Sequence, residues 1–390
     1  MRKIRSVAAV GDVSDVNAWS GIPYHFWRAA GAAAFAAAPW RLDLARITWQ
    51  RYVWNAFGIL RGGRGGFQYS DWFLNMAERQ IPRELLAGEI ITFNQHFPRG
   101  RSVKHAGGTL NYYIDAPFIA LVTGRGLDLH LPAKVATRAV AAERENYAAA
   151  DRVVTMARWA AKVVVNECGV PREKVFTILP GANLDLPPGW SFPGLEGRPG
   201  VDRDFVLGFV GKDWQRKGLP LLVDVQADLT RRGWKVAVHA AGRAPGDFSA
   251  RPGVRFVGFI DKRTDAPRFA EFLAGCDLGC LFSQREALGI STLEFLRVGV
   301  PVAGFDHEGP ADTLPVDAGF RFGLGTSASS VAERMDAYLR DEAEQRRFRE
   351  AARRWSPLVT WERCVREFQQ LWEHGGVASP VQPWLGLAKG

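Results

Sequence analysis

The chain has 390 residues, 47% of them hydrophobic and 23% charged, which is typical of globular proteins and long enough for two separate cores. Its net charge of +9 argues against an acidic disordered chain. The four cysteines show no CxxC or Cys/His cluster, which excludes a disulfide scaffold and a zinc motif and predicts reduced thiols in a cytoplasmic protein. The apolar run over residues 29–40 is shorter than the roughly 20 residues that cross a bilayer, so neither a membrane span nor a secretion signal is expected.

The first half of the chain predicts strands that alternate with helices. An apolar strand is expected over residues 4–10, then a polar loop over 11–21 and a helix that continues to about residue 38. Further buried strands are predicted over residues 89–93, 110–114, 152–156 and 174–179, and helices over residues 133–149 and 159–167. Strands without polar alternation indicate a parallel sheet that is covered on both faces.

Tryptophan and arginine are concentrated near the amino terminus. Six of the 14 tryptophans are Trp19, Trp27, Trp40, Trp49, Trp54 and Trp72. Between residues 40 and 72 they alternate with the arginines Arg41, Arg46, Arg51, Arg61 and Arg64. Such a mixture suits an anionic membrane surface, because arginines meet phosphates while indole rings lie at the headgroup level. A core-facing stripe with solvated arginines is the alternative, and the pattern does not decide between them.

Nucleic acid is a weaker interpretation of the same basic half. The two Arg-Gly-Gly repeats over residues 61–66 resemble an RNA-binding segment, but a single pair inside a globular chain is more typical of a surface loop. No zinc-finger, helix-turn-helix or RNA-recognition signature accompanies them, so we expect no nucleic-acid partner.

The second half repeats the alternation after a segment rich in proline and glycine over residues 181–200, which predicts a linker. Strands are predicted over residues 205–210, 235–240, 254–257, 278–282 and 302–305, and helices over residues 219–231, 266–274, 291–298 and 331–340. Two such series of alternating strands and helices are more than one doubly wound sheet contains. The sequence therefore predicts an α/β protein of two Rossmann-like parallel-sheet domains that face a central cleft, where ligands bind at the carboxyl ends of the strands.

The strongest functional signal follows the predicted strand over residues 278–282. Glu286 lies on a short loop, Gly289 allows close backbone approach, and a helix begins near Ser291. The free N–H groups and the dipole of that helix start form a site for a diphosphate. Glu294, expected in the first helical turn, is suited to accept hydrogen bonds from ribose hydroxyls, while Glu286 reaches the sugar beyond the diphosphate.

A second signal follows the predicted strand over residues 205–210. Lys212 and Lys217 lie five positions apart after Gly211, and their charges can neutralise a departing diphosphate. Either motif alone is weak, because glycine and lysine are common after strands. The two in this order carry more weight.

These residues resemble the retaining, nucleotide-sugar-dependent glycosyltransferases of family four, which have the GT-B fold. The Glu-x7-Glu pattern of that family is matched by Glu286 and Glu294, followed by Gly299-Val300-Pro301. The basic pair of the family matches Lys212 and Lys217, with Lys212 in place of the more usual arginine, which exchanges a bidentate fork for a point charge. Ala287 stands where the family has a glycine.

The resemblance extends less specifically to the first half. Gly21 lies in the segment Trp19-Ser-Gly-Ile-Pro-Tyr24, where the family has a glycine motif that faces the donor phosphates and the acceptor. Residues 147–155 and 180–183 resemble two further family segments. Many relatives place a His-Asp pair after a strand, and the matching place here ends in Asp115 without the histidine. Asp115 is a candidate to orient or deprotonate the acceptor hydroxyl, or it is a turn residue; His25, His96 and His105 are weaker candidates.

The resemblance implies sugar transfer with retention of configuration and no bound metal or other cofactor. Asp202-Arg-Asp204 matches a metal-binding pattern but falls in the linker, where it is expected to be solvated. The expected domains are residues 1–190 for the acceptor, residues 200–356 for the donor, and residues 357–390 as a helix that crosses back. The residues expected to bind the donor are Gly21, Lys212, Lys217, Gly242, Gly258, Phe259, Ile260, Glu286, Leu288, Gly289, Ile290, Ser291 and Glu294, and those expected in catalysis are Glu286, Lys217, Lys212 and Asp115.

The expected partners are a nucleotide-diphosphate sugar, a hydroxyl acceptor such as a membrane lipid or a polysaccharide or lipopolysaccharide precursor, and an anionic membrane surface on the cytoplasmic side. Two alternatives remain open. One is another GT-B enzyme, such as a nucleotide-sugar epimerase, and the other is a non-catalytic basic protein that binds membrane or nucleic acid.

Overall fold

The computed structural model describes residues 4–377 apart from residues 37, 59, 61, 62, 64, 128, 193–198 and 243–250. Its contacts divide the chain into two compact units. The N-terminal unit holds Met1–Leu179 and Cys364–Ala378, and the C-terminal unit holds Pro180–Arg363 and Ser379–Gly390. Arg61 and Arg64 of the Arg-Gly-Gly segment lie outside the described residues.

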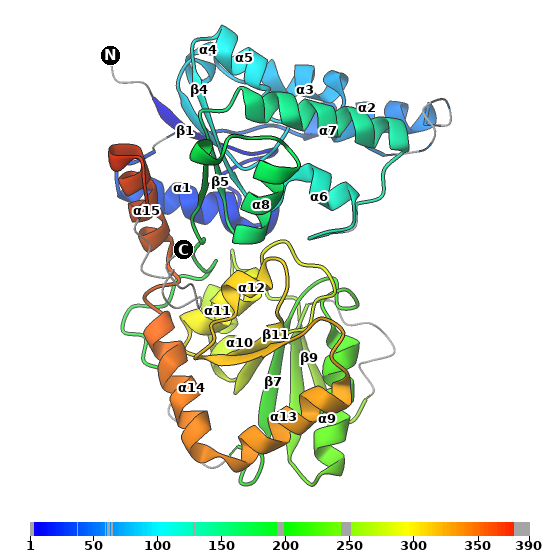
Figure 1. Ribbon diagram of the computed structural model, residues 1–390, viewed down its shortest axis with the longest axis vertical. Coiled ribbons are helices and arrows are strands. Elements are labelled where there is room, and N and C mark those ends of the chain that lie inside the picture. Colours follow the sequence, from blue (N-terminus) through cyan, green and yellow to red (C-terminus); the bar gives the residue numbers. More distant parts are fainter. Residues whose placement is uncertain are drawn as a thin grey trace. The chain divides into compact units, whose positions relative to one another are not determined.

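The N-terminal unit is built on a six-stranded parallel sheet of order β2-β1-β3-β4-β5-β6 (Figure 1). Its strands are β1 (Arg5–Ala8), β2 (Ala38–Pro39), β3 (Glu89–Thr92), β4 (Thr109–Ile114), β5 (Arg152–Thr155) and β6 (Val175–Thr177). Its helices are α1 (Ile22–Ala32), α2 (Ala45–Ala56), α3 (Asp71–Glu78), α4 (Arg83–Leu86), α5 (Gly100–His105), α6 (Phe118–Val122), α7 (Ala133–Ala148) and α8 (Arg158–Asn166), with 3₁₀ turns at Ala18–Gly21, Phe67–Tyr69 and Arg172–Lys174.

The C-terminal unit has a second six-stranded parallel sheet, of order β12-β11-β10-β7-β8-β9. Its strands are β7 (Phe205–Val210), β8 (Val236–Ala241), β9 (Val254–Gly258), β10 (Leu278–Leu281), β11 (Val302–Phe305) and β12 (Gly319–Phe322). Its helices are α9 (Leu219–Arg231), α10 (Ala266–Ala274), α11 (Ile290–Arg297), α12 (Pro310–Thr313), α13 (Ala328–Arg340) and α14 (Glu342–Trp355). Every residue of the central strands β10 and β11 is buried, as a parallel sheet covered on both faces requires.

The predicted fold class is confirmed, and each predicted strand is present to within a few residues. One helix was wrong: α1 ends at Ala32, and the chain turns and forms the short strand β2 before residue 40. A left-handed residue, Ala34 at φ 51°, follows that end and breaks the helical path that the alanine-rich run favours. The structure also adds elements that the sequence pattern did not reveal, among them α2, α14 and β12.

A close approach of helix to sheet positions α11. A Cβ atom at Gly279 of β10 would lie 2.2 Å from the Phe295 ring, and one at Gly208 of β7 would lie 2.8 Å from it. Both strands therefore need glycine where the α11 side chain lies flat on the sheet. The result is that α11 begins directly above the carboxyl ends of β7 and β10.

The first residues of the predicted linker are packed within the C-terminal unit. A Cβ atom at Gly181 would lie 2.3 Å from the backbone nitrogen of Trp361. The backbone N–H of Ala182 donates to the Val359 carbonyl at 2.9 Å, and the Trp361 indole donates to the Asn183 Oδ1 atom at 3.0 Å. Packing and hydrogen bonds therefore hold residues 181–183 in place. Residues 193–198 of the same segment lie outside the described residues.

The last helix, α15 (Trp361–His374), supplies most of its residues to the N-terminal unit. The Phe368 ring lies 5.0 Å from Phe26 and 4.8 Å from Tyr113, centroid to centroid. The Trp372 indole donates to a Glu89 carboxylate oxygen at 2.5 Å. The end of the chain thereby completes the core beside β3 and β4. Residues 378–390 lie outside the described residues.

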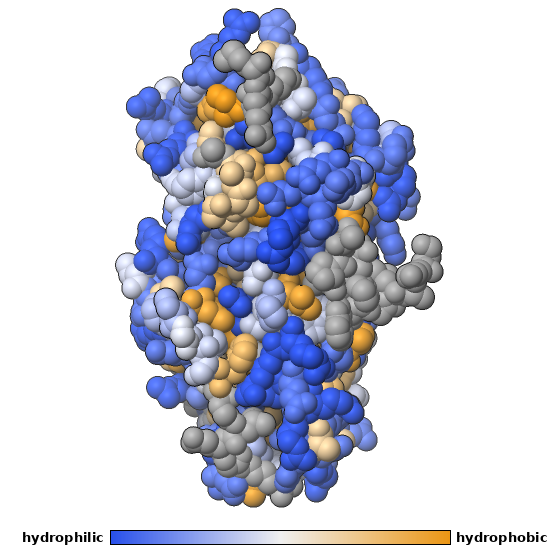
Figure 2. All heavy atoms as spheres, turned by 90° about the vertical axis from the view of Figure 1, so that its left-hand side faces the viewer, coloured by the Kyte–Doolittle hydropathy of each residue, from blue (hydrophilic) through white to orange (hydrophobic). Residues whose placement is uncertain are grey.

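Within the described ranges, none of the helices is both long and apolar enough to span a bilayer. The face drawn in Figure 2 is mainly hydrophilic, and its hydrophobic residues lie in small separate groups.

Candidate functional site

The candidate site lies at the carboxyl ends of neighbouring strands in the C-terminal unit. Lys212 follows β7, Gly242 follows β8, Phe259 follows β9 and Glu286 follows β10. Since the order β10-β7-β8-β9 makes these strands neighbours, the four loops share one edge of the sheet. The structure therefore brings to one edge residues that are up to 74 positions apart in sequence.

Glu286 is a buried charged residue of this edge. Its side chain is 11% exposed and accepts hydrogen bonds from the Arg216 guanidinium at 3.2 Å and the Ser283 hydroxyl at 3.1 Å. The Lys217 ammonium lies 3.7 Å from the same oxygen. Burial by itself raises the pKa of Glu286, but the charges of Lys217 and Arg216 outweigh it and hold the pKa below its usual value. Glu286 is thus an ionised carboxylate at neutral pH.

A second loop braces the Glu286 loop. The backbone N–H of Glu286 donates to a Glu308 carboxylate oxygen at 2.9 Å, and the Gly309 N–H donates to the Glu286 carbonyl at 3.2 Å. His307 bonds the Ser283 carbonyl through its Nε2 atom at 2.8 Å. Glu308 adopts a left-handed conformation at φ 47°, which costs about 1 kcal/mol or more in a residue other than glycine. The loop after β11 thus fixes the position of Glu286.

The start of α11 has the geometry expected for an anion site. Gly289 precedes the helix in a left-handed conformation at φ 84°, and no side chain caps the helix. A Cβ atom there would lie 3.0 Å from the Leu281 side chain and 3.1 Å from the Thr313 hydroxyl. The helix starts at Ile290, one residue earlier than predicted, and Leu288 and Ser291 are buried. The first N–H groups are therefore not consumed by a capping side chain.

Glu294 lies differently from the prediction. It is the fifth residue of α11 and therefore belongs to the second turn, not the first. Its side chain is 2% exposed and forms an ion pair with Lys262, whose ammonium also lies 4.3 Å from the Phe269 ring centroid. Lys262 was missed because its only sequence signal is a lysine two residues after the predicted Ile260. In the structure it is a third cation near the carboxyl ends of these strands.

Lys212 and Lys217 point to different partners. The exposed Lys212 ammonium lies 4.9 Å from the ring centroid of Phe259, which is itself 53% exposed. Lys217 instead runs over Gly211, where a Cβ atom would lie 2.6 Å from its Cδ atom, and reaches Glu286. The predicted basic pair is therefore present, with one lysine at the Phe259 side of the edge and the other at the Glu286 side.

The glycines predicted near the base hold the β7, β8 and β9 loops together. Gly242, at φ 142°, would place a Cβ atom 2.0 Å from the Gly211 carbonyl oxygen. Its N–H donates to the Gly258 carbonyl at 3.0 Å, and Ile260 is buried beneath. Only glycine fits this position, because the three loop backbones approach one another there.

Gly21 and Asp115 belong to the N-terminal unit. Gly21 precedes α1 at φ 87°, after Trp19 and Ser20 at φ 51° and 58°, so three consecutive left-handed residues form this turn. Asp115 follows β4, and its carboxylate accepts the Ala116 N–H at 2.8 Å, as a turn residue does. This contact supports the turn interpretation of Asp115.

One of the histidine candidates, His96, is packed in the core of the N-terminal unit. His96 is buried against Tyr69 and Phe118, with ring centroids 5.0 and 4.7 Å away, and its Nε2 atom bonds the Ala139 carbonyl at 2.9 Å. Burial lowers the pKa of His96 to about 4, so the ring is neutral.

Asp202 and Asp204, which match a metal-binding pattern in the sequence, are both exposed. Among the described residues, no three His, Cys, Asp or Glu side chains are grouped as metal ligands.

Sequence comparison connects this edge of the sheet to a known family. Residues 198–355 match the model of the glycosyl transferases group 1. The chain is 27% identical to the glycogen synthase of Deinococcus deserti over 179 residues, which cover 45% of this chain and 39% of that protein. It is 24% identical to the D-inositol 3-phosphate glycosyltransferase of Nocardia farcinica over 257 residues, 61% of this chain and 57% of that protein. Both matches span less than two thirds of the relative.

Solved structures share the fold at low identity. Sucrose-phosphate synthase from Thermosynechococcus elongatus superposes with a TM-score of 0.68 at 15% identity, over 95% of this chain and 98% of that one. The HepE protein of Anabaena, solved in complex with UDP and glucose, superposes with a TM-score of 0.63 at 16% identity, over 95% of this chain and all (100%) of that one. Residues 198–355 are thus similar to the glycosyl transferases group 1, and the shared two-sheet architecture shows that the chain has the GT-B fold.

Proposed function

We propose that the chain is a retaining glycosyltransferase that moves a sugar from a nucleotide-diphosphate donor to a hydroxyl acceptor without a bound metal. The observation that carries the proposal is the grouping of Glu286, Lys217 and Arg216 at the carboxyl edge of the second sheet, beside the uncapped start of α11. The family match supports the reaction class, and the donors of the relatives support a nucleotide sugar.

The donor diphosphate is assigned to the α11 start and to the two lysines. N–H groups at Gly289, Ile290 and Ser291 and the helix dipole favour a doubly charged group there. Lys217 and Lys212 add positive charge from the β7 loop. Charge grows on the diphosphate as the bond to the sugar breaks, so these groups stabilise the transition state more than the bound donor and thereby accelerate transfer.

Glu286 is assigned to the sugar. An ionised carboxylate in a buried loop accepts hydrogen bonds from sugar hydroxyls strongly and in a fixed direction. Its anchoring by Ser283, Arg216 and the Glu308 loop holds it without further rearrangement when the donor binds. Ala287, in place of the glycine typical of the family, changes the backbone next to this contact and so bears on which sugar fits.

The nucleoside is assigned to the β8 and β9 loops and to Glu294. Gly242, Gly258 and Ile260 offer backbone groups to the base, and the exposed Phe259 ring offers a stacking face. Glu294 accepts from the ribose hydroxyls, with Lys262 neutralising its charge while the site is empty. The structure of HepE in complex with UDP-glucose makes uracil the first base to test.

The acceptor hydroxyl is proposed to attack the sugar from the face that the diphosphate leaves, so that its proton passes to the leaving phosphate and the configuration is kept. Asp115 and the Gly21 turn are the acceptor-side candidates in the N-terminal unit. Asp115 is assigned to orient the hydroxyl through its carboxylate.

An anionic membrane surface is proposed as the place where a lipid or lipopolysaccharide acceptor is met. Trp49 and Tyr52, three residues apart on α2, are 60% and 66% exposed, and Phe57 just after the helix is 54% exposed. Arg46 and Arg51 are exposed on the same helix. The core-facing alternative is therefore wrong for Trp49, whereas it is confirmed for Trp40, which is buried. Sedimentation with anionic vesicles, lost in Trp49→Ser/Tyr52→Ser, tests the contact.

A donor panel tests the function directly. UDP-, GDP- and ADP-sugars are first compared by thermal shift, since a ligand that binds the folded state raises its melting temperature. The preferred radiolabelled donor is then incubated with acceptor fractions, and the anomeric configuration of the product is read by NMR. We expect Lys217→Ala to lose transfer at least about a hundredfold while remaining folded.

Lys235→Ala is the matched control, because Lys235 is an exposed lysine of the same unit at the opposite, amino end of β8. Equal transfer by Lys217→Ala and Lys235→Ala would refute the assignment. Sugar product formed from the donor without any acceptor would favour an epimerase, and a chain that binds none of the donors would favour a non-catalytic binding protein.

A further inference from the structure

A hollow lies on the helical layer of the N-terminal unit, and none of the donor-site residues of the C-terminal unit lines it. It has a volume of about 570 Å³ and is lined by α3, α7 and the start of α5. A shallower hollow of about 730 Å³ adjoins it, and the two share Arg99 and Arg101. Cavities of this size hold ligands of a few rings. Apart from His105, the weaker acceptor candidate that lines the adjoining hollow, none of the residues predicted for the donor or the acceptor lines either hollow.

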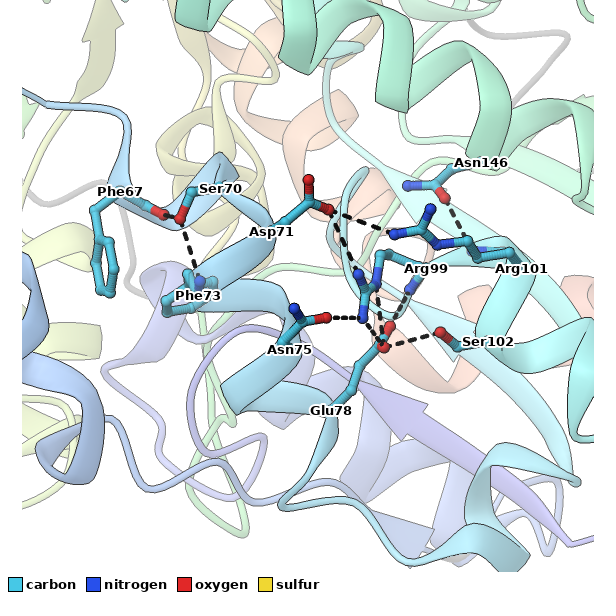
Figure 3. A network of polar contacts seen from close by, with 11 residues as sticks. Phe67, Ser70, Asp71, Phe73, Asn75, Glu78, Arg99, Arg101, Ser102 and Asn146 are labelled. Carbon is cyan, nitrogen blue, oxygen red and sulfur yellow. Dashed lines mark hydrogen bonds and ion pairs between the residues drawn. The ribbon is translucent and has the colours of Figure 1, made fainter. Parts of the chain in front are cut away.

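Arg99 lines both hollows, and its side chain is held by the polar contacts drawn in Figure 3. Its guanidinium donates to Glu78 at 2.6 and 3.1 Å and to the Asn75 Oδ1 atom at 2.7 Å, and lies 3.5 Å from Asp71. Its backbone N–H donates to the other Glu78 oxygen at 2.8 Å. Glu78 also accepts from the Ser102 hydroxyl at 2.8 Å. The side chain of Arg99 is therefore locked, and its charge is already balanced by Glu78.

A buried amide joins the opposite wall. Asn146 of α7 accepts the Gly100 N–H at 2.9 Å and donates to the Gln95 carbonyl at 3.0 Å. A Cβ atom at Gly100 would lie 2.6 Å from the Ala149 Cβ atom, so α5 and α7 touch there. The hollow is thus held open between three helices whose contacts beneath it are fixed, as a preformed binding site requires.

The other cationic side chains that line this hollow have fewer ionic partners than Arg99 has. Lys134 and Arg138, four residues apart on one face of α7, are exposed and have no hydrogen-bond or ion-pair partner among the residues that the structure describes. Like charges at this spacing repel each other. Arg101 has a single contact, 3.4 Å from Asp71, and both side chains are largely exposed. Asp71 and Glu145 are the acidic lining residues of this hollow.

The adjoining hollow extends this pattern. Arg79 and Arg83 line it, are exposed, and likewise have no ionic partner within the described part of the chain. Glu78 is its acidic lining residue, and Arg99 occupies that carboxylate. Uncommitted positive charge therefore runs from one hollow into the next.

An aromatic platform lies beside these cations. The Trp72 ring is held edge-on by Phe67 at 5.8 Å and remains 38% exposed on the hollow. The Tyr69 ring lines the same wall, and burial raises the pKa of its hydroxyl, so it stays neutral. An indole face next to cations suits a ligand with apolar ring faces and peripheral negative charges.

We propose that the two hollows bind a short acidic oligosaccharide, with a sugar ring on Trp72 and its carboxylate, sulfate or phosphate groups on Arg101, Lys134 and Arg138. The combination of a ring platform and spaced cations favours an acidic sugar over a free anion, which needs no platform. The concave shape favours it over a bilayer surface, which needs a protruding one. This site shares no residue with the donor site of the C-terminal unit.

The test is isothermal titration calorimetry of the full chain with a sulfated heparin-derived tetrasaccharide, neutral maltotetraose and inorganic sulfate. We expect the tetrasaccharide to bind, maltotetraose and sulfate to bind at least tenfold more weakly, and binding to weaken with salt. Arg138→Ala and Trp72→Ala should each weaken tetrasaccharide binding about fivefold or more, as loss of a charge pair or a stacked ring does.

Matched controls separate the pocket from general charge and general aromatic surface. Lys162→Ala removes an exposed, unpaired cation from α8, and Trp49→Ala removes an exposed indole from α2; neither residue lines the hollows. The proposal would be overturned if the control variants weakened tetrasaccharide binding as much as Arg138→Ala and Trp72→Ala do. It would also be overturned if inorganic sulfate bound tightly and neither added maltotetraose nor the Trp72→Ala substitution changed that binding. UDP titration of the same variants should be unchanged, so failure here and failure of the donor site are told apart.

Discussion

Arg216 donates to Glu286 at 3.2 Å and also to the carbonyl of the preceding residue, Arg285, at 2.6 Å. One guanidinium thus holds both the carboxylate and the backbone of the loop that carries it. Asp213 in turn accepts from the Arg216 Nε atom at 2.9 Å, which fixes the guanidinium from the β7 side. This clamp connects the two motifs that the sequence places about 70 residues apart.

Arg216→Ala should therefore lower kcat/KM by about tenfold to a hundredfold, because a hydrogen bond to a charged group contributes about 1.5–3 kcal/mol. Arg216→Lys should recover only part of the loss, since a lysine cannot bond both acceptors at once. Arg231→Ala, which removes an arginine that is 75% exposed from the end of α9, is the control. Equal kinetics for Arg216→Ala and Arg231→Ala would show that the clamp is not needed.

Lys262→Met should destabilise the C-terminal unit, because it leaves Glu294 buried without its counter-charge. Loss of one partner of a buried ion pair costs about 3 kcal/mol. Urea unfolding measures the change, with Arg268→Ala on the exposed surface of α10 as the control. The double variant Lys262→Met/Glu294→Gln should be more stable than the sum of the single losses. Additive losses would mean that the two side chains act independently.

Gly242→Ala should abolish nucleotide binding while the sheet stays folded. Its Cβ atom would lie 2.0 Å from the Gly211 carbonyl oxygen, so the loop that carries Lys212 has to move. Gly325→Ala is the matched control, because Gly325 also has a positive φ, of 84°, but nothing lies within 4 Å of an added Cβ atom. UDP titration and circular dichroism measure the two effects. Normal UDP affinity in Gly242→Ala would contradict the predicted base site.

Glu143 should make stability depend on pH. Its fully buried carboxylate accepts the N–H groups of Phe118 and Ile119 at 2.5 and 3.0 Å and the Tyr147 hydroxyl at 3.0 Å. Burial raises the pKa of Glu143 from 4.5 to about 7, although the two N–H groups partly offset it. The folded state therefore holds the proton more tightly than the unfolded chain does.

The contribution of Glu143 to stability is therefore complete below pH 4.5, falls as the pH rises to about 7, and is constant above that. The loss is of the order of 2–3 kcal/mol. Glu143→Gln, which keeps an acceptor oxygen but cannot titrate, should remove this part of the pH dependence. Urea unfolding of both proteins between pH 5 and 8 gives the comparison, and parallel curves would contradict the prediction.

The sequence predicted most of the site residues because each follows a recognisable strand. Glu286 and Lys217 were found from their places after apolar runs, and the structure brings their side chains to 3.7 Å. Arg216, Lys262 and Glu308 were missed because an arginine, a lysine or a glutamate in a loop has no pattern that separates a site from solvated charge. The prediction that Glu294 lies in the first turn of the helix was wrong, because the exact start of the helix depends on the backbone conformation at Gly289.

The sequence by itself determined the α/β class, the order of the main strands and the resemblance to the group 1 glycosyltransferases, since apolar period and motif spacing are local properties of the chain. Only the tertiary structure decided the ion pairs of Glu286 and Glu294 and the hollow between α3 and α7. These depend on contacts between residues up to 70 positions apart, which loop conformation and side-chain packing set together. The same reason explains why α15 completes the N-terminal core: its apolar face fits there only once β3 and β4 are folded.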